Sequence, residues 1–166
     1  MAQSTSTASA LPRNDQADVH LDPSVSRFAT LGSLIYIGMG LCHGLVTLID
    51  AVRPTFLGPA NPVLLEQLAI TPVALAPSMM MWSAYLGFNW SHSLGLLTFG
   101  SLYLLIVRRA PELLKRIPAF LLLALVVAAI FCLIGGVYWF YAPATVSAIG
   151  GACYLRAYLG LRRHRG

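Results

Sequence analysis

The sequence predicts an all-α membrane protein: a four-helix transmembrane bundle with a short external interfacial helix. Apolar residues make up 57% of the 166 positions and charged residues only 10%, whereas soluble domains carry about 25% charged residues. The charges are also segregated, because the runs 28–49, 67–107 and 117–155 contain no Asp, Glu, Lys or Arg. Runs of this length need a bilayer as their solvent, which excludes an ordinary soluble domain.

The four expected spans follow from the length of a membrane-crossing helix, which is about 20 residues. The first uncharged run holds one span, 28–50. In the second run, Pro72 and Pro77 interrupt a helix because proline lacks an amide donor, so the span is expected at 82–107. The third run has room for two spans, 118–141 and 143–161, with Pro143 opening the fourth helix because proline is favoured in the first turn.

The distribution of Lys and Arg predicts the orientation, because these residues are enriched in cytoplasmic loops. An even number of spans puts both termini and the 108–116 loop on one side. That side holds ten of the eleven basic residues, and the other side holds only Arg53. Both termini are therefore expected in the cytoplasm. The net charge of +5 is explained by this topology, and no nucleic-acid partner is expected.

Three segments lie outside the expected spans. Residues 1–26 have the composition of a disordered cytoplasmic tail, residues 162–166 form a basic cytoplasmic tail, and the membrane domain is expected at 27–161. In the external segment, Asn61 followed by Pro62 is typical of a helix start. The segment 62–70 is therefore expected to form a short helix in the plane of the interface, with an irregular loop containing one helical turn as the alternative.

Polar residues form one continuous stripe on each of the first two spans, at spacings of three and four residues. Helical rise puts His43, Asn89 and His92 at similar depth in the outer half of the bilayer, with Asp50 and Tyr85 nearer the external surface. The stripe of the first span consists of Tyr36, Gly40, His43, Thr47 and Asp50. The stripe of the second span consists of Trp82, Tyr85, Asn89, His92, Leu96, Phe99 and Tyr103.

Small residues are expected to bring these two spans close together, because they let helix backbones approach each other in membranes. Gly40 and Gly44 are four residues apart in the first span, which places both on the same face of the helix. Gly87, Ser91 and Gly95 repeat it in the second. Close packing also permits hydrogen bonds between the helices, and these bonds could be the whole role of the histidines.

Intramembrane polar groups are costly and often functional, so the predicted ligand-binding residues are His43, Asp50, Tyr85, Asn89 and His92. The favoured occupant is a membrane-protein partner or a small, apolar, lipid-like ligand. The alternatives are simple interhelical packing, an ion pair between Asp50 and Arg53, haem b held by His43 and His92, and proton-coupled transport. Four short spans without an internal repeat do not favour a transporter.

Evidence for catalysis is absent from the sequence. It lacks GxSxG, P-loop, HExxH and dinucleotide-binding motifs, so no catalytic residue is predicted and an enzymatic role is not favoured. The three cysteines, Cys42, Cys132 and Cys153, lack metal-ligand spacing and are expected to pack as small hydrophobic residues. Neither a metal nor a resident cofactor is therefore expected, haem b remaining the alternative.

The most distinctive segment of the chain begins at Trp82 and reads W-x4-GFNxSHSxG. It resembles the signature of a family of small, uncharacterised bacterial four-span integral membrane proteins. The resemblance extends over about residues 32–107 and includes His43-Gly44 and the 56–59 segment. It implies a four-span bundle in the bacterial cytoplasmic (inner) membrane, and it implies no established activity.

Overall fold

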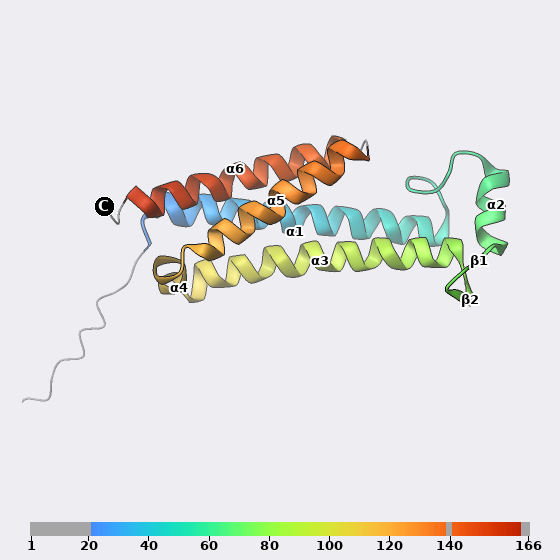
Figure 1. Cartoon of the computed structure of the whole chain (residues 1–166), viewed down its shortest axis with the longest axis horizontal. Coiled ribbons are helices and arrows are strands. Elements are labelled where there is room, and N and C mark those ends of the chain that lie inside the picture. The colour runs from blue at the N-terminus through green and yellow to red at the C-terminus, as the bar shows by residue number, and fades with distance from the viewer. Residues whose placement is uncertain (1–20, 139–140, 164–166) are drawn as a thin grey trace, which may run out of the picture.

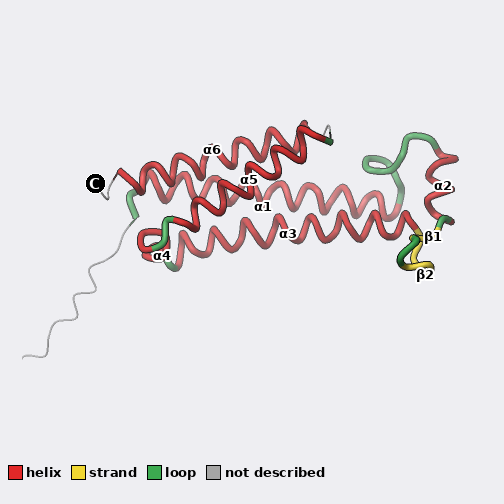
Figure 2. The backbone as a smooth tube through the Cα atoms, in the orientation of Figure 1, coloured by secondary structure: helices red, strands yellow, loops and turns green. Residues whose placement is uncertain are grey.

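The computed structural model describes residues 21–138 and 141–163, which are mostly helical (Figures 1 and 2). The elements in chain order are α1 (Pro23–Val52), α2 (Pro62–Ile70), β1 (Pro72–Val73), β2 (Ala76–Met80), α3 (Met81–Arg109), α4 (Pro111–Arg116), α5 (Ala119–Val137) and α6 (Tyr141–Arg163). Helices α1 and α3 lie side by side along the length of the molecule, and α5 and α6 cover one end of this pair (Figure 1).

Helix α1 begins five residues earlier than the sequence analysis expected. The Asp22 side chain caps it by accepting hydrogen bonds from the backbone amides of Ser24 and Val25, and Pro23 occupies the first turn. The prediction that residues 1–26 form a disordered tail is therefore wrong for 23–26. Residues 1–20 lie outside the described residues, as do residues 164–166 of the predicted basic tail.

The segment between α1 and α3 contains the short helix that the sequence predicts. Helix α2 spans Pro62–Ile70, and the Asn61 side chain accepts a hydrogen bond of 3.0 Å from the Val63 amide. The helix has no buried residue and runs across the end of the α1–α3 pair (Figure 1). This direction agrees with a helix lying in the plane of the interface.

A two-stranded antiparallel hairpin follows α2, and the all-α prediction missed it. Strand β1 pairs with β2, with Pro72 opposite Met80 and Val73 opposite Ala76. The prolines that stop a helix here are tolerated in the strands because both strands are edges of the sheet. The hairpin returns the chain to the start of α3.

The α5–α6 connection lies earlier in the chain than predicted. Helix α5 ends at Val137, and Tyr138 caps it, whereas the predicted span continued to Tyr141. Helix α6 begins at Tyr141, so Pro143 lies in its first turn instead of opening it. Either position suits proline, because the first-turn amides have no partner within the helix. Residues 139 and 140 lie outside the described residues.

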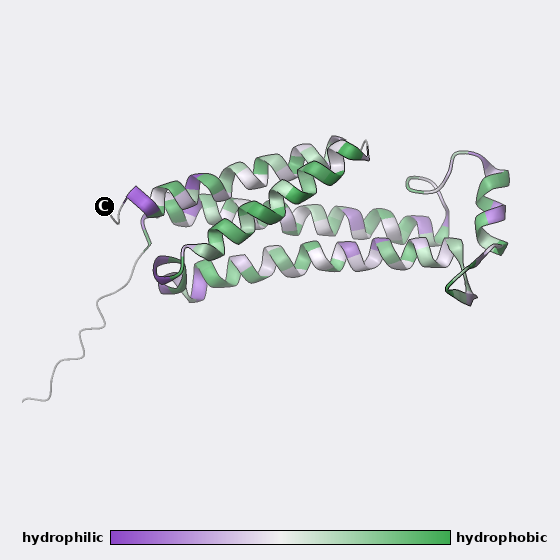
Figure 3. Ribbon diagram, in the orientation of Figure 1, coloured by the Kyte–Doolittle hydropathy of each residue, from purple (hydrophilic) through white to green (hydrophobic). Residues whose placement is uncertain are grey.

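Three helices, α1, α3 and α5, are long and apolar enough to cross a membrane (Figure 3). Helix α6 is long enough, with 23 residues, but it does not reach the same apolarity. It carries Arg156, Arg162 and Arg163, together with several glycines and polar residues. Of the four predicted spans, composition and length therefore support three.

Helix α1 lies at the centre of the packing, because it contacts α3 and α6, and α5 packs on α6. Two glycines bring α1 and α3 together. A Cβ added at Gly100 would lie 2.7 Å from the backbone oxygen of Ser33, and one at Gly40 would lie 2.9 Å from the backbone nitrogen of Leu97. The predicted role of the small residues Gly87, Ser91 and Gly95 in the second span was wrong, because an added Cβ at Gly87 or Gly95 would meet no atom of another part of the structure within 4 Å.

Candidate functional site

His43 of α1 and Asn89 of α3 form a hydrogen bond between the two helices. The His43 Nε2 and Asn89 Oδ1 atoms are 3.0 Å apart, and Asn89 Nδ2 donates to the backbone oxygen of Tyr85 at 2.8 Å. Because the Asn89 amide group donates to Tyr85, its oxygen is the acceptor for His43. This assignment makes His43 Nε2 the protonated donor.

His92 lies next to this pair and completes what we call the polar cluster: His43, Asn89 and His92. The His92 and His43 rings meet edge to face, with centroids 5.1 Å apart. The Phe131 ring of α5 lies 5.5 Å from the His92 ring, measured between centroids. The Phe88 ring stacks beside the His92 ring at a centroid distance of 6.4 Å and an interplanar angle of 17°. Both histidines are partly exposed, whereas Asn89 is buried.

The two histidines differ in hydrogen bonding. His43 is bonded to Asn89, but the His92 ring makes no hydrogen bond within residues 21–138 and 141–163. A neutral imidazole has one donor and one acceptor. His92 therefore presents an unused hydrogen-bonding group on α3, a helix that is long and apolar enough to cross a membrane.

Asp50 is not part of the polar cluster. Its side chain is fully buried and accepts hydrogen bonds from four consecutive backbone amides: Thr55 (2.9 Å), Phe56 (2.8 Å), Leu57 and Gly58 (3.1 Å). Asp50 lies two helical turns beyond His43 on α1. Its carboxylate therefore bonds to the loop after α1 and not to the histidines. It closes this loop, and the predicted ion pair with Arg53 was wrong because these amides take both carboxylate oxygens.

Tyr85 attaches the same loop to α3. Its hydroxyl donates to the Leu57 backbone oxygen at 3.0 Å, and its ring stacks on Trp82 with centroids 5.6 Å apart. Gly58 packs against Trp82, where an added Cβ would be 3.3 Å from the indole. Of the five predicted ligand residues, three lie together, and Asp50 and Tyr85 instead fix the loop between α1 and α2.

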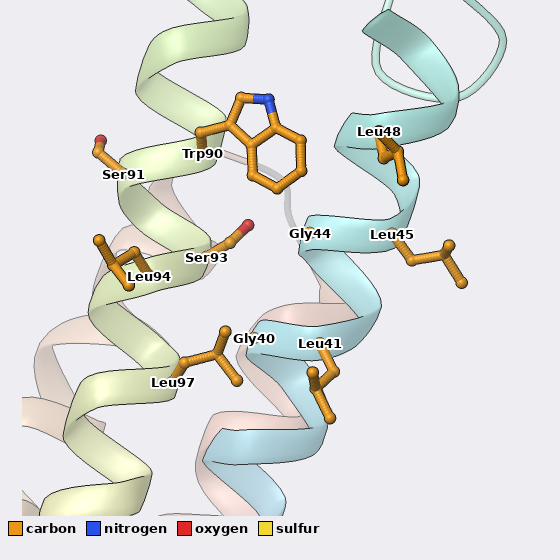
Figure 4. Close-up of a pocket in the computed structure, with 10 residues that line it drawn as sticks. All are labelled: Gly40, Leu41, Gly44, Leu45, Leu48, Trp90, Ser91, Ser93, Leu94 and Leu97. Atoms are coloured by element: carbon orange, nitrogen blue, oxygen red, sulfur yellow. The ribbon is translucent and has the colours of Figure 1, made fainter. Parts of the chain in front are cut away.

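An apolar groove lies between α1 and α3 (Figure 4). It measures about 460 Å³, and its lining includes Gly40, Gly44, Trp90, Ser93 and several leucines. The Ser93 hydroxyl donates to the Asn89 backbone oxygen at 2.9 Å, and that of Ser91 donates to the Phe88 backbone oxygen at 2.8 Å, so neither proton is available to a ligand. The groove therefore suits a hydrocarbon chain, and the Trp90 indole N–H is a donor in its lining that has no hydrogen-bond partner within the described residues.

An aromatic cluster in the core includes one residue that the sequence analysis missed. Tyr36, Phe99 and Tyr103 belong to the predicted stripes, and Tyr154 of α6 joins them at ring distances of 5.4 to 6.2 Å. The Tyr154 hydroxyl lies 3.3 Å from Ser33 Oγ. Tyr154 is fully buried, so this cluster holds α6 against α1 and α3 and forms no opening.

The arrangement of the two histidines does not fit haem b. Two axial imidazoles must approach the iron from opposite sides of a flat macrocycle. Here the rings contact each other directly, and His43 Nε2 is already bonded to Asn89. Among the described residues there is also no group of three or more His, Cys, Asp or Glu side chains that could hold a metal ion.

Comparison of the chain with protein-family models, curated proteins and solved structures gave no match. The resemblance of the segment that begins at Trp82 to a four-span bacterial family stays a prediction.

Proposed function

We propose that this chain is a small multi-pass membrane protein that binds a lipid-like ligand through the polar cluster. The observation that carries the proposal is the His92 ring, which is partly exposed and has no hydrogen-bond partner within the described residues. An unpaired polar group is costly in hydrocarbon, so a ligand that bonds to it gains free energy. Phe88 and Phe131 supply apolar contacts beside it.

The proposal includes a fourth crossing by α6, which gives a four-helix bundle with both termini in the cytoplasm of a bacterial inner membrane. Helix α6 is about 34 Å long at the helical rise, which is enough to cross a hydrocarbon core of about 30 Å. The Arg156 guanidinium lies 5.8 Å from the Phe28 ring centroid, near the N-terminal end of α1. A long basic side chain at this end can extend to the headgroups. The ten-to-one distribution of basic residues supports the orientation.

Native mass spectrometry of the full chain, released from membranes in mild detergent, tests ligand binding. The proposal expects a bound small molecule on the wild-type chain, with occupancy reduced in His92→Phe, which keeps a ring of similar shape. Ser91→Ala is the matched control, because the Ser91 hydroxyl bonds to the Phe88 backbone oxygen of its own helix. A wild-type chain without any bound molecule, or equal occupancy in His92→Phe, would contradict the proposal.

A membrane-protein partner is the second candidate occupant of the same face. The exposed ring of Phe88 favours it, because exposed aromatic side chains often anchor protein interfaces. Crosslinking in membranes distinguishes the two occupants, since a partner gives a discrete heavier species that is lost in Phe88→Ala. The absence of such a species would contradict the partner.

A further inference from the structure

The chemistry around His92 also indicates the class of ligand, an inference that rests on the proposed function. We propose that the ligand is a neutral amphiphile with a planar ring that carries a carbonyl or hydroxyl group, of the quinone or quinol type. Three features of the described residues support this: the absence of charge, the unused hydrogen-bonding capacity of His92, and the exposed aromatic surface beside it.

The charge of the headgroup follows from the residues that surround the cluster. The uncharged runs 28–49 and 67–107 include all three cluster residues. The nearest carboxylate along α1, Asp50, already accepts bonds from four amides. A charged headgroup would be buried without a counter-ion, which is strongly unfavourable in hydrocarbon. The ligand is therefore neutral at this point.

The hydrogen bond that the His92 ring can form favours a ligand with a carbonyl or hydroxyl group. His43 Nε2 donates to Asn89, which leaves the His92 ring to donate to a carbonyl or to accept from a hydroxyl. Among the side chains that line the groove of Figure 4, the Ser91 and Ser93 hydroxyls donate within α3, and the Trp90 indole N–H can only donate, whereas the His92 ring can either donate or accept. Headgroup recognition is thus assigned to the His92 side of the α1–α3 contact.

The shape of the headgroup follows from the rings beside His92. Phe88 is 67% exposed, and its plane is within 17° of the His92 plane. Phe131 meets His92 at an interplanar angle of 69°. Aromatic rings attract one another in offset-stacked and edge-to-face arrangements. A flat ring can therefore stack on the open Phe88 surface while its carbonyl bonds to His92, and its apolar tail remains in the lipid.

Binding of two matched probes to the full chain in nanodiscs tests this inference. The first probe is a benzoquinone with a ten-carbon tail, and the second is decylbenzene, which has the same tail and an aromatic ring but no carbonyl. We expect saturable quinone binding at least tenfold tighter than decylbenzene binding. We also expect His92→Phe to weaken quinone binding about tenfold, which corresponds to about 1.4 kcal/mol, and to leave decylbenzene binding unchanged.

Two further variants exclude a general effect on folding. His92→Gln keeps an amide hydrogen bond and should retain most of the quinone affinity, and Ser91→Ala should bind as the wild type does. Equal affinity for the two probes would overturn the headgroup assignment. A bound molecule of another class in native mass spectra, together with no quinone binding, would overturn this inference and leave the proposed function standing. No bound molecule and no probe binding would overturn both.

Discussion

Asp50 is the residue on which the loop after α1 depends most, because its carboxylate accepts four backbone hydrogen bonds at a buried position. Asp50→Ala should lower the free energy of unfolding by about 2–3 kcal/mol, since it leaves several amide donors without their acceptor. Asp50→Asn should cost less, because the amide oxygen remains. Titration with a denaturing detergent measures the change, and exposed Glu66 offers a control in Glu66→Gln. A loss for Asp50→Ala no larger than that of the control would contradict this role.

Substitutions of His43 and Asn89 test whether these two residues of the polar cluster stabilise the fold together. In a double-mutant cycle of His43→Leu and Asn89→Leu, we expect a coupling free energy of about 0.6–1.7 kcal/mol, the range for interhelical hydrogen bonds in membranes. A second double-mutant cycle, of His43→Leu and Thr98→Val, serves as the uncoupled reference, because Thr98 is at an exposed position of α3. If the effects of His43→Leu and Asn89→Leu add within about 0.3 kcal/mol, the hydrogen bond contributes nothing measurable.

At the scale of elements, the α1–α3 contact depends on close backbone approaches at Gly40 and Gly100. Gly100→Ala would bring a methyl group against the Ser33 backbone oxygen, which cannot rotate away, so the helices must separate. We expect a loss of about 1–3 kcal/mol in the free energy of unfolding, as for other overpacked sites. Gly95→Ala is the control on the same helix, because its added Cβ meets nothing within 4 Å. Equal effects of the two substitutions in the same titration would show that this contact is not tight.

The elements differ in how far the sequence could predict them. Hydropathy and proline positions located the long helices, and the Asn61-Pro62 capping signal located α2, because these signals are local. The β1–β2 hairpin escaped prediction because its strands are short and rich in proline. Three- and four-residue spacing brought His43, Asn89 and His92 together, but it could not show that Asp50 turns to amides that follow it in the chain. Nor could it show which glycines face a neighbour, since Gly95 and Gly100 differ only in the surface that each presents.

At the scale of the whole molecule, the number of crossings decides on which side of the membrane the C-terminus lies. By composition, three helices are apolar enough to cross a membrane. If α6 also crosses, the C-terminus lies on the same side of the membrane as α4. In the orientation proposed above, the polar cluster lies in the outer half of the bilayer, where a ligand could reach it from the lipid. If α6 does not cross, the C-terminus instead lies on the side of α2.

Labelling single cysteines with a membrane-impermeant maleimide on intact cells tests this arrangement most directly. The three native cysteines are first replaced by alanine, and one cysteine is then placed at Glu66 of α2, at Glu112 of α4, or after Gly166; both glutamates are exposed. We expect Glu66→Cys to be labelled on intact cells, and Glu112→Cys and the C-terminal cysteine to be labelled only after permeabilisation. Labelling of the C-terminal cysteine on intact cells, with Glu112→Cys still protected, would contradict the fourth crossing and the four-helix arrangement built on it.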